Sequence, residues 1–151
     1  MGLQFSPARS WRPAAMNPDE SEGLAEPLQG KVLYIEDQLV HWELVEAMLA
    51  RSPGIKLIKT GSGREGVQLA RSELPDVILL DLHLPDISGL EVVRSLSELI
   101  AKRRFRVILL TGDSFSIDVV KAMSLGAHEY WVKPVTPQRL LAGLARALRR
   151  E

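Results

Sequence analysis

The stretch VILLDLHLP, residues 77–85, decides the fold class of this chain, because a wholly apolar run ends there in an acid. Val77 to Leu80 are apolar without alternation, which is typical of a strand buried on both faces of a parallel sheet. Asp81 follows at the carboxyl end of this run. A strand of this kind needs neighbours on both sides and helices on both faces.

Four further apolar runs flank this stretch, at residues 32–35, 55–58, 107–110 and 130–132. Between the runs, apolar residues recur at three- and four-residue spacing and predict five amphipathic helices. The stripes are Trp42, Val45 and Leu49; Val67, Ala70 and Leu74; Leu90, Val93 and Leu96; Val120 and Met123; and Leu140, Leu141, Leu144 and Leu148. Thr136 is the N-cap candidate of the last helix, with Pro137 in its first turn. Alternating strands and helices predict an α/β fold with a parallel sheet.

The composition of the runs also predicts the order of the strands. The first, third and fourth runs are almost wholly apolar, as central strands should be. Lys56 and Lys59 interrupt or follow the second run, and the short fifth run ends at Lys133. Lysine is typical of edge strands, where it discourages pairing with another chain. The prediction is a doubly wound five-stranded parallel sheet of order 2-1-3-4-5, with its crevice beyond the carboxyl ends of strands one and three.

Polar residues follow the strands at this crevice. They are Glu36 and Asp37 after strand one, Asp81 after strand three, Thr111 and Gly112 after strand four, and Lys133 after strand five. Crowded acids repel one another unless a cation joins them, and a hard divalent ion, Mg²⁺ or Mn²⁺, suits oxygen ligands. A carboxylate can act as a nucleophile toward phosphorus, with a metal, a lysine and a hydroxyl stabilising the transferred group. An acidic rim without chemistry is the alternative interpretation.

The overall composition favours one soluble domain with a tail. The 151 residues include 19 basic and 19 acidic side chains and no cysteine, so disulfides, thiolate metal sites and a general affinity for nucleic acid are not expected. No apolar run has the length of a membrane span or the form of a secretory signal, and a cytoplasmic location is expected. Residues 1–29 are rich in proline and acids, which predicts a flexible N-terminal tail or linker before a domain at residues 30–151. Trp11 in this segment could anchor a partner, but an incidental tryptophan is the preferred interpretation.

Several segments together resemble the receiver domain of two-component response regulators, over residues 30–150. The segment VLYIED, residues 32–37, is similar to the first strand of that family with its acidic pair. Asp81, with Pro85 four residues on and Gly89 eight residues on, resembles the phosphoacceptor signature. The pair Thr111-Gly112 and the segment GAHEYWVKP, residues 126–134, match the remaining signatures.

The resemblance implies a CheY-like (flavodoxin-like) fold and a role for each matching position. Asp81 would be phosphorylated by a histidine kinase or a histidine phosphotransfer protein. Asp37 and Asp81 would bind Mg²⁺ directly, Glu36 through water, and His83 through its backbone carbonyl. Lys133 would pair with the phosphoryl group, Gly112 would let it approach, Thr111 would swing toward it, and Tyr130 would move inward behind Thr111. The protein would be a signalling domain rather than an enzyme.

Some positions depart from the commonest pattern of the family. Gln38 follows the acidic pair, and Val135 replaces the frequent phenylalanine after lysine-proline. His83 and Asp113 stand where residues tune the lifetime of the phosphate, and the hypothesis is that their side chains face the attacking water. His41 and His128 are expected to be surface residues, because neither has ligand partners at metal-like spacing. The basic run at 102–106 is expected to be a solvated loop rather than a nucleic-acid site.

Two other functional classes fit the residues less well. Haloacid-dehalogenase-type phosphatases place a second aspartate two residues after the nucleophile, where this chain has His83. A flavodoxin-like cofactor binder needs a phosphate loop after strand one, where Glu36 and Asp37 would repel phosphate. A receiver fold used as an interaction module without phosphorylation stays open as an alternative.

The partners expected from the resemblance are proteins. The downstream partner would bind the face built from the fourth helix, the fifth strand and the fifth helix, and the region of Trp131 is a second candidate contact surface. A homodimer is also compatible with the sequence, whereas direct contacts with nucleic acid or membrane are not expected. No output domain follows residue 151, so the chain would be a single-domain regulator, which Met1 favours, or the receiver of a hybrid histidine kinase.

Overall fold

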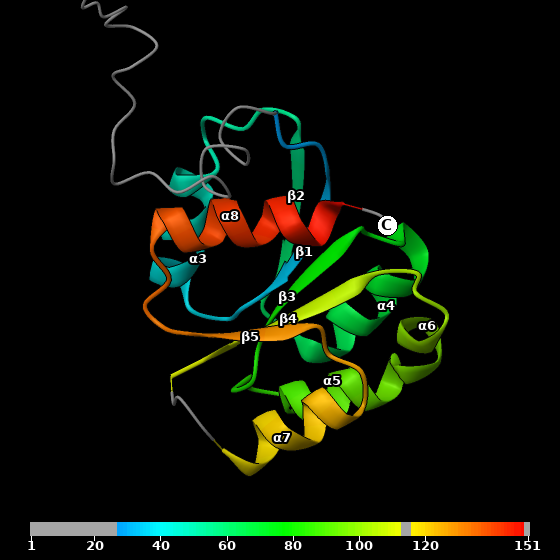
Figure 1. Ribbon diagram of the computed structural model, residues 1–151. Helices are drawn as coiled ribbons and strands as arrows, with labels where there is room; N and C mark the ends of the chain where they lie inside the picture. The colour runs from blue at the N-terminus through cyan, green and yellow to red at the C-terminus, as the bar shows by residue number, and fades with distance from the viewer. Residues whose placement is uncertain (1–26, 113–115, 150–151) are drawn as a thin grey trace, which may run out of the picture.

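A five-stranded parallel sheet forms the centre of the molecule (Figure 1). The structure is a computed structural model and describes residues 27–112 and 116–149. The strands are β1 (Gly30–Ile35), β2 (Ile55–Thr60), β3 (Val77–Asp81), β4 (Arg106–Thr111) and β5 (Glu129–Val132). Their order is β2-β1-β3-β4-β5, which confirms the order predicted from the sequence.

Helices cover both faces of this sheet, as Figure 1 shows. Two of them, α3 (Leu39–Met48) and α8 (Pro137–Leu148), pack on one face. The other face carries α4 (Gly63–Glu73), α5 (Gly89–Ser95), α6 (Ser97–Ala101) and α7 (Ile117–Ser124). Five of these helices were predicted; α6, a short helix of 5 residues directly after α5, was not.

Alternate residues of the central strands enter two separate cores. Leu33 and Ile35 of β1 point into the core beneath α4 to α7, whereas Val32 and Tyr34 point into the core beneath α3 and α8. All five residues of β3 are buried. The unbroken apolar character of the central strands therefore reflects burial on both faces, as the sequence predicted.

The last helix begins as predicted. The hydroxyl of Thr136 accepts a hydrogen bond of 3.1 Å from the Arg139 backbone amide, and Pro137 occupies the first turn of α8. This cap fixes the helix start just after Lys133 and so positions the loop that carries the lysine.

Two side chains lie differently from what the sequence predicted. Trp131 is only 1% exposed, so its own side chain cannot form a contact surface, although Tyr130 and Val132 beside it are each 38% exposed. The Trp131 ring packs so closely on α8 that a Cβ atom on Gly143 would lie 2.1 Å from it. In α7, Val119 is buried and Val120 is 45% exposed, the reverse of the stripe predicted from the sequence. Both errors arose because a short amphipathic segment can place either of two neighbouring residues inward.

Three predictions lie partly or wholly beyond the residues that the structure describes. Trp11 and residues 1–26 of the predicted tail fall outside them, and so does Asp113. Within residues 27–112 and 116–149, none of the helices combines the length and apolar character that crossing a bilayer requires.

Candidate functional site

Three carboxylates meet where β1 and β3 end. These strands are hydrogen-bonded neighbours, with Ile35 level with Leu80, so Glu36 and Asp81 emerge side by side. One oxygen from each of Glu36, Asp37 and Asp81 lies within 4.8 Å of the others. Glu36 and Asp81 are buried, with 2% and 4% of their surface exposed, whereas Asp37 is exposed. The crevice predicted from the strand order therefore holds a compact acidic group.

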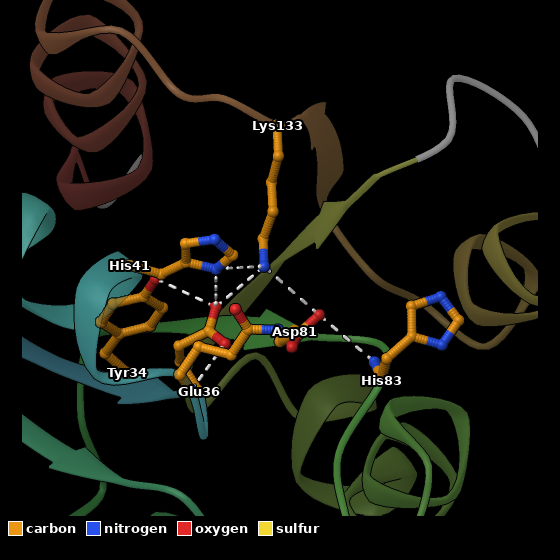
Figure 2. A network of polar contacts seen from close by, with 7 residues as sticks. Tyr34, Glu36, His41, Asp81, His83 and Lys133 are labelled. Atoms are coloured by element: carbon orange, nitrogen blue, oxygen red, sulfur yellow. Dashed lines mark hydrogen bonds and ion pairs between the residues drawn. The ribbon is translucent and has the colours of Figure 1, made fainter.

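Lys133 reaches this acidic group from the end of β5. Its Nζ atom lies 2.8 Å from Glu36 Oε1 and 3.6 Å from Asp81 Oδ1, and Figure 2 shows the side chain extending toward both carboxylates. The Lys133 side chain is 19% exposed, and the Lys133–Pro134 peptide bond is cis. The lysine thus neutralises part of the charge of a largely buried pair of acids.

Thr111 and Gly112 stand at the end of β4, next to the phosphoacceptor candidate. The β3–β4 register places Asp81 level with Leu110, so Thr111 follows one residue beyond, and it is buried. A Cβ atom on Gly112 would meet no atom of the described residues within 4 Å. Packing among these residues therefore does not require glycine at this position.

Tyr130 lies on the neighbouring edge strand, away from the acids. It belongs to β5, where it is level with Leu109, and it is 38% exposed. Thr111 is level with Val132, two residues beyond Tyr130 on the same strand.

The loop after Asp81 is held close to the acid. The His83 amide donates a hydrogen bond of 3.2 Å to Asp81 Oδ1, whereas the His83 ring is exposed and lies away from the carboxylates in Figure 2. Gly89, the first residue of α5, packs on the back of this loop, because a Cβ atom there would lie 2.7 Å from the Asp81 carbonyl oxygen. The glycine eight residues after Asp81 is therefore a packing requirement.

Asp86 anchors the middle of the same loop on another helix. Its carboxylate accepts hydrogen bonds from the Gly63 and Arg64 amides at the start of α4, at 2.8 and 3.0 Å. These amides hold the pKa of the Asp86 carboxyl far below its usual range. The loop that carries His83 is thus fixed between Asp81 and α4.

Two members of the site were missed in the sequence. His41 was expected to be a surface residue without partners, but its Nδ1 atom lies 3.2 Å from Lys133 Nζ and 3.4 Å from Glu36 Oε1. The Tyr34 hydroxyl donates a hydrogen bond of 3.3 Å to Glu36 Oε1. The available signals were positional: His41 is in the first turn of the helix that follows the acidic pair, and Tyr34 is two residues before Glu36 on the same face of β1.

The acids at the site differ in their protonation behaviour. Burial and the charge of Glu36 raise the pKa of Asp81 above its usual value. Burial also opposes ionisation of Glu36, but the hydrogen bond and charge of Lys133 outweigh it and lower the pKa of Glu36. Burial and the neighbouring Glu36 raise the pKa of the Tyr34 hydroxyl, which stays neutral and donates its proton to the carboxylate.

The donor set fits a hard divalent cation. All three candidate side-chain ligands are carboxylates, and Lys133 lies closer to Glu36, at 2.8 Å, than to Asp81, at 3.6 Å. Burial and the charge of Glu36 raise the pKa of Asp81, and a divalent ion bound between these carboxylates would offset that charge.

The fold and this arrangement of acids and lysine define a receiver domain of the CheY-like class. Residues 32–145 match the family model of the response regulator receiver domain, and the chain belongs to this family. Receiver domains of this family act in two-component signal transduction.

Curated relatives support the same assignment. The cell cycle transcriptional regulator CtrA from Caulobacter vibrioides is 38% identical over 120 residues, which cover 80% of this chain and 51% of CtrA. The cell cycle response regulator CtrA from Brucella ovis is 36% identical over a similar region. The chain spans about half the length of the curated relatives that it matches.

Solved structures agree in fold. The receiver domain of the sensor histidine kinase PA1611 from Pseudomonas aeruginosa is 29% identical with a TM-score of 0.70, over 80% of this chain and 98% of that chain. That structure holds a magnesium ion in its active site cleft. The chemotaxis protein CheY4 from Vibrio cholerae is 27% identical with a TM-score of 0.70, over 80% and 99% of the two chains.

Proposed function

We propose that Asp81 accepts a phosphoryl group from a histidine kinase or a histidine phosphotransfer protein, in a reaction that requires Mg²⁺. The observation that carries this proposal is the position of Asp81. It is a buried carboxylate at the switch point of the sheet, with two further acids and one lysine around it. The relatives named above supply the class of signalling system.

The residues would divide the work of phosphoryl transfer. An oxygen of Asp81 forms the new bond to phosphorus while the bond from phosphorus to the donor histidine nitrogen breaks, and that nitrogen keeps the electron pair. Asp37, Asp81 and the His83 carbonyl would bind the cation directly, and Glu36 would do so through water. The cation would offset the negative charge of the entering phosphoryl group.

Lys133, Thr111 and Gly112 would complete the site. The ammonium of Lys133 would bind a phosphoryl oxygen, since it already lies 3.6 Å from Asp81 Oδ1. The hydroxyl of Thr111 would turn toward the same group, and the open space beside Gly112 would admit it. Tyr130 would then move inward and favour the active member of a two-state equilibrium.

The switch would be read by a protein partner at the face formed by α7, β5 and α8. Exposed apolar side chains on this face include Ile117, Val120, Tyr130 and Val132, at 67%, 45%, 38% and 38% exposure. If these side chains form one contiguous patch, it would suit a protein contact. The protein would act as a signalling domain whose only chemistry is its own phosphorylation and dephosphorylation.

The phosphoryl donor would dock beside Asp37 at the start of α3. Leu39 and Val40 are each 65% exposed, although both are apolar and lie two and three residues after Asp37. A donor histidine must approach Asp81 from this open end of the crevice, so a donor protein would cover these two side chains. The phosphoryl donor and the downstream partner would therefore use different faces of the domain.

Phosphorylation is tested by intact-mass spectrometry after incubation with acetyl phosphate and Mg²⁺. We expect the mass to increase by one phosphoryl group, with no increase in EDTA or in Asp81→Asn. Beryllofluoride, a stable mimic of the phosphoryl group, should bind only the wild-type chain. Absence of both the adduct and beryllofluoride binding would contradict the proposal and leave an interaction module that works without phosphorylation.

A further inference from the structure

The ring of His41 lies directly against the ammonium group of Lys133. His41 comes from the first turn of α3 and Lys133 from the loop after β5, and Figure 2 shows the ring beside the end of the lysine. The distance from His41 Nδ1 to Lys133 Nζ is 3.2 Å, and the His41 side chain is 36% exposed.

This contact fixes the direction of the hydrogen bond. A lysine ammonium has three donors and no acceptor, so Nδ1 of His41 must accept the hydrogen bond and the ring proton must be on Nε2. The 3.4 Å contact from the same Nδ1 to Glu36 Oε1 is then not a hydrogen bond. Lys133 donates to His41 and Glu36 at once and links them.

The two hydrogen bonds leave the third donor of the ammonium free for the reacting side of the site. Glu36 and His41 accept at 2.8 and 3.2 Å, and Asp81 Oδ1 is 3.6 Å away. In Figure 2, His41 and Asp81 lie on opposite sides of the ammonium. A group on Asp81 would thus meet a donor that is already aimed at it.

An open cavity lies beside this lysine. Its volume is about 270 Å³ and its lining is mainly apolar. The residues around it include His41, Lys133, Leu44, Met48 and Val135. Lysine has a flexible four-carbon chain, so its ammonium keeps one position only where acceptors hold it. Of the residues that line this cavity, His41 accepts a hydrogen bond from the ammonium.

We propose that His41 is a positioning residue, which together with Glu36 fixes the orientation of the Lys133 ammonium so that its remaining donor faces Asp81. The proposal concerns the same site as the proposed function and rests on it for its effect on phosphorylation. The placement of the lysine itself does not depend on that function, because it is a property of the protein without phosphate or metal. A hydrogen-bond donor that is already in position stabilises the charge of the transferred phosphoryl group without first having to reorganise.

The first test is nuclear magnetic resonance of the metal-free protein, which observes the Lys133 ammonium and the His41 ring nitrogens. In the wild-type protein we expect the Nε2–H tautomer of His41, with an Nδ1 resonance that shifts in Lys133→Met. In His41→Ala the ammonium signal should broaden or shift, and His41→Gln should restore it, since the amide oxygen is a replacement acceptor. His128→Gln is the matched control, because that side chain is also 36% exposed and lies outside the site, one residue before β5.

The second test is affinity for beryllofluoride and the rate of phosphorylation by acetyl phosphate, both with Mg²⁺. His41→Ala should lower both by on the order of fivefold, the factor that corresponds to one hydrogen bond of ordinary net strength. His41→Gln should recover most of the loss, and His128→Gln should match the wild-type protein.

The outcomes separate this proposal from the proposed function. An unchanged Lys133 signal in His41→Ala, or an Nδ1 resonance that does not respond to Lys133→Met, would overturn the positioning role. The Lys133→Met comparison decides the question even if His41→Ala does not fold. Failure of the wild-type protein to bind beryllofluoride would instead count against phosphorylation, and the metal-free measurements would still decide the role of His41.

Discussion

Glu36 and Lys133 form the shortest ion pair among the described residues, with 2.8 Å between Oε1 and Nζ, although 97 residues separate them in the sequence. The Glu36 side chain has no exposed surface, so its charge depends on this partner. The pair joins the end of β1 to the end of β5 across the two strands between them. It therefore contributes both to the stability of the fold and to the placement of the lysine.

Loss of Lys133 should destabilise the protein through this pair. Lys133→Met leaves the charge of Glu36 buried without a cation, and we expect the free energy of unfolding to fall by about 3 kcal/mol. Adding Glu36→Gln should recover most of that loss, because the buried charge is removed with its partner. Urea unfolding in EDTA measures both variants, and a double variant as unstable as Lys133→Met would contradict the prediction.

Asp81→Asn should stabilise the metal-free protein at neutral pH. Burial and Glu36 raise the pKa of Asp81, so its ionised form costs stability once the pH exceeds that pKa, and asparagine removes the cost. The gain should disappear below the unfolded pKa of about 3.9, where the aspartate is protonated in both states. Thermal unfolding in EDTA at several pH values measures it.

The matching experiment adds Mg²⁺ to the same two proteins. Wild-type chain should gain melting temperature with Mg²⁺ concentration, because only the folded state assembles the three carboxylates. The melting temperature of Asp81→Asn should rise much less, because this variant lacks one of the three carboxylates. Equal gains for the two proteins would indicate that the cation binds elsewhere.

His128 should make stability fall as the solution becomes acidic. Burial and the charge of Arg106 lower its pKa in the folded state; Arg146 acts in the same direction and Glu129 opposes them. The unfolded chain therefore binds a proton more readily below its own pKa of about 6.5, and the contribution of neutral His128 is lost as the pH falls from there. His128→Gln should reduce the loss of melting temperature between about pH 7.5 and 5.5. An equal dependence of melting temperature on pH in the wild-type protein and in His128→Gln would contradict this prediction.

Gly89→Ala should damage both stability and phosphorylation. The added Cβ would lie 2.7 Å from the Asp81 carbonyl oxygen and from Leu82 Cα, so the backbone of the phosphoacceptor loop must move. We expect a loss of about 1–3 kcal/mol in the free energy of unfolding, together with slower phosphorylation by acetyl phosphate. Ala101→Gly, at the exposed end of α6, is a control for a glycine exchange outside the site. A variant as stable and as reactive as the wild-type protein would show that the loop tolerates the contact.

The donor-docking surface predicts a separation between two kinds of phosphorylation. Leu39→Ser with Val40→Ser should slow phosphotransfer from a histidine phosphotransfer protein that phosphorylates the wild-type chain, because the protein contact is weakened. Phosphorylation by acetyl phosphate should be unchanged, since this small donor needs no docking surface. Ile117→Ser on α7 is equally exposed and should leave both rates unchanged. If the double variant is phosphorylated at the wild-type rate by both donors, the donor protein docks elsewhere.

The pattern of the strands was readable in the sequence because it is a local property. Val77 to Leu80 are apolar without alternation, and Lys56 and Lys59 belong to a strand at the edge of the sheet. Burial on both faces favours consecutive apolar residues, and an edge position favours lysine. The strand order could therefore be predicted from the composition of each strand. The carboxyl ends of parallel strands share one edge, so the meeting of Glu36 with Asp81 was also predictable.

Which of two neighbouring side chains faces inward was less predictable. Trp131 is buried against α8, and Tyr130 is partly exposed, although both belong to the same four-residue strand. The sequence of so short a strand is compatible with either orientation. The inward orientation of Trp131 depends on Gly143 of α8, because a side chain there would clash with the indole ring.

The sequence by itself thus determined the α/β fold, the strand order and the edge of the sheet where polar residues gather, since each follows from local periodicity and from the direction of parallel strands. Only the tertiary structure decided that Lys133 holds Glu36 more closely than Asp81, and that His41 is its second partner. Those choices depend on distances of a few tenths of an ångström between side chains from different elements. The packing of α3 and of the loop before α8 on the sheet sets these distances, and no run of consecutive residues encodes them.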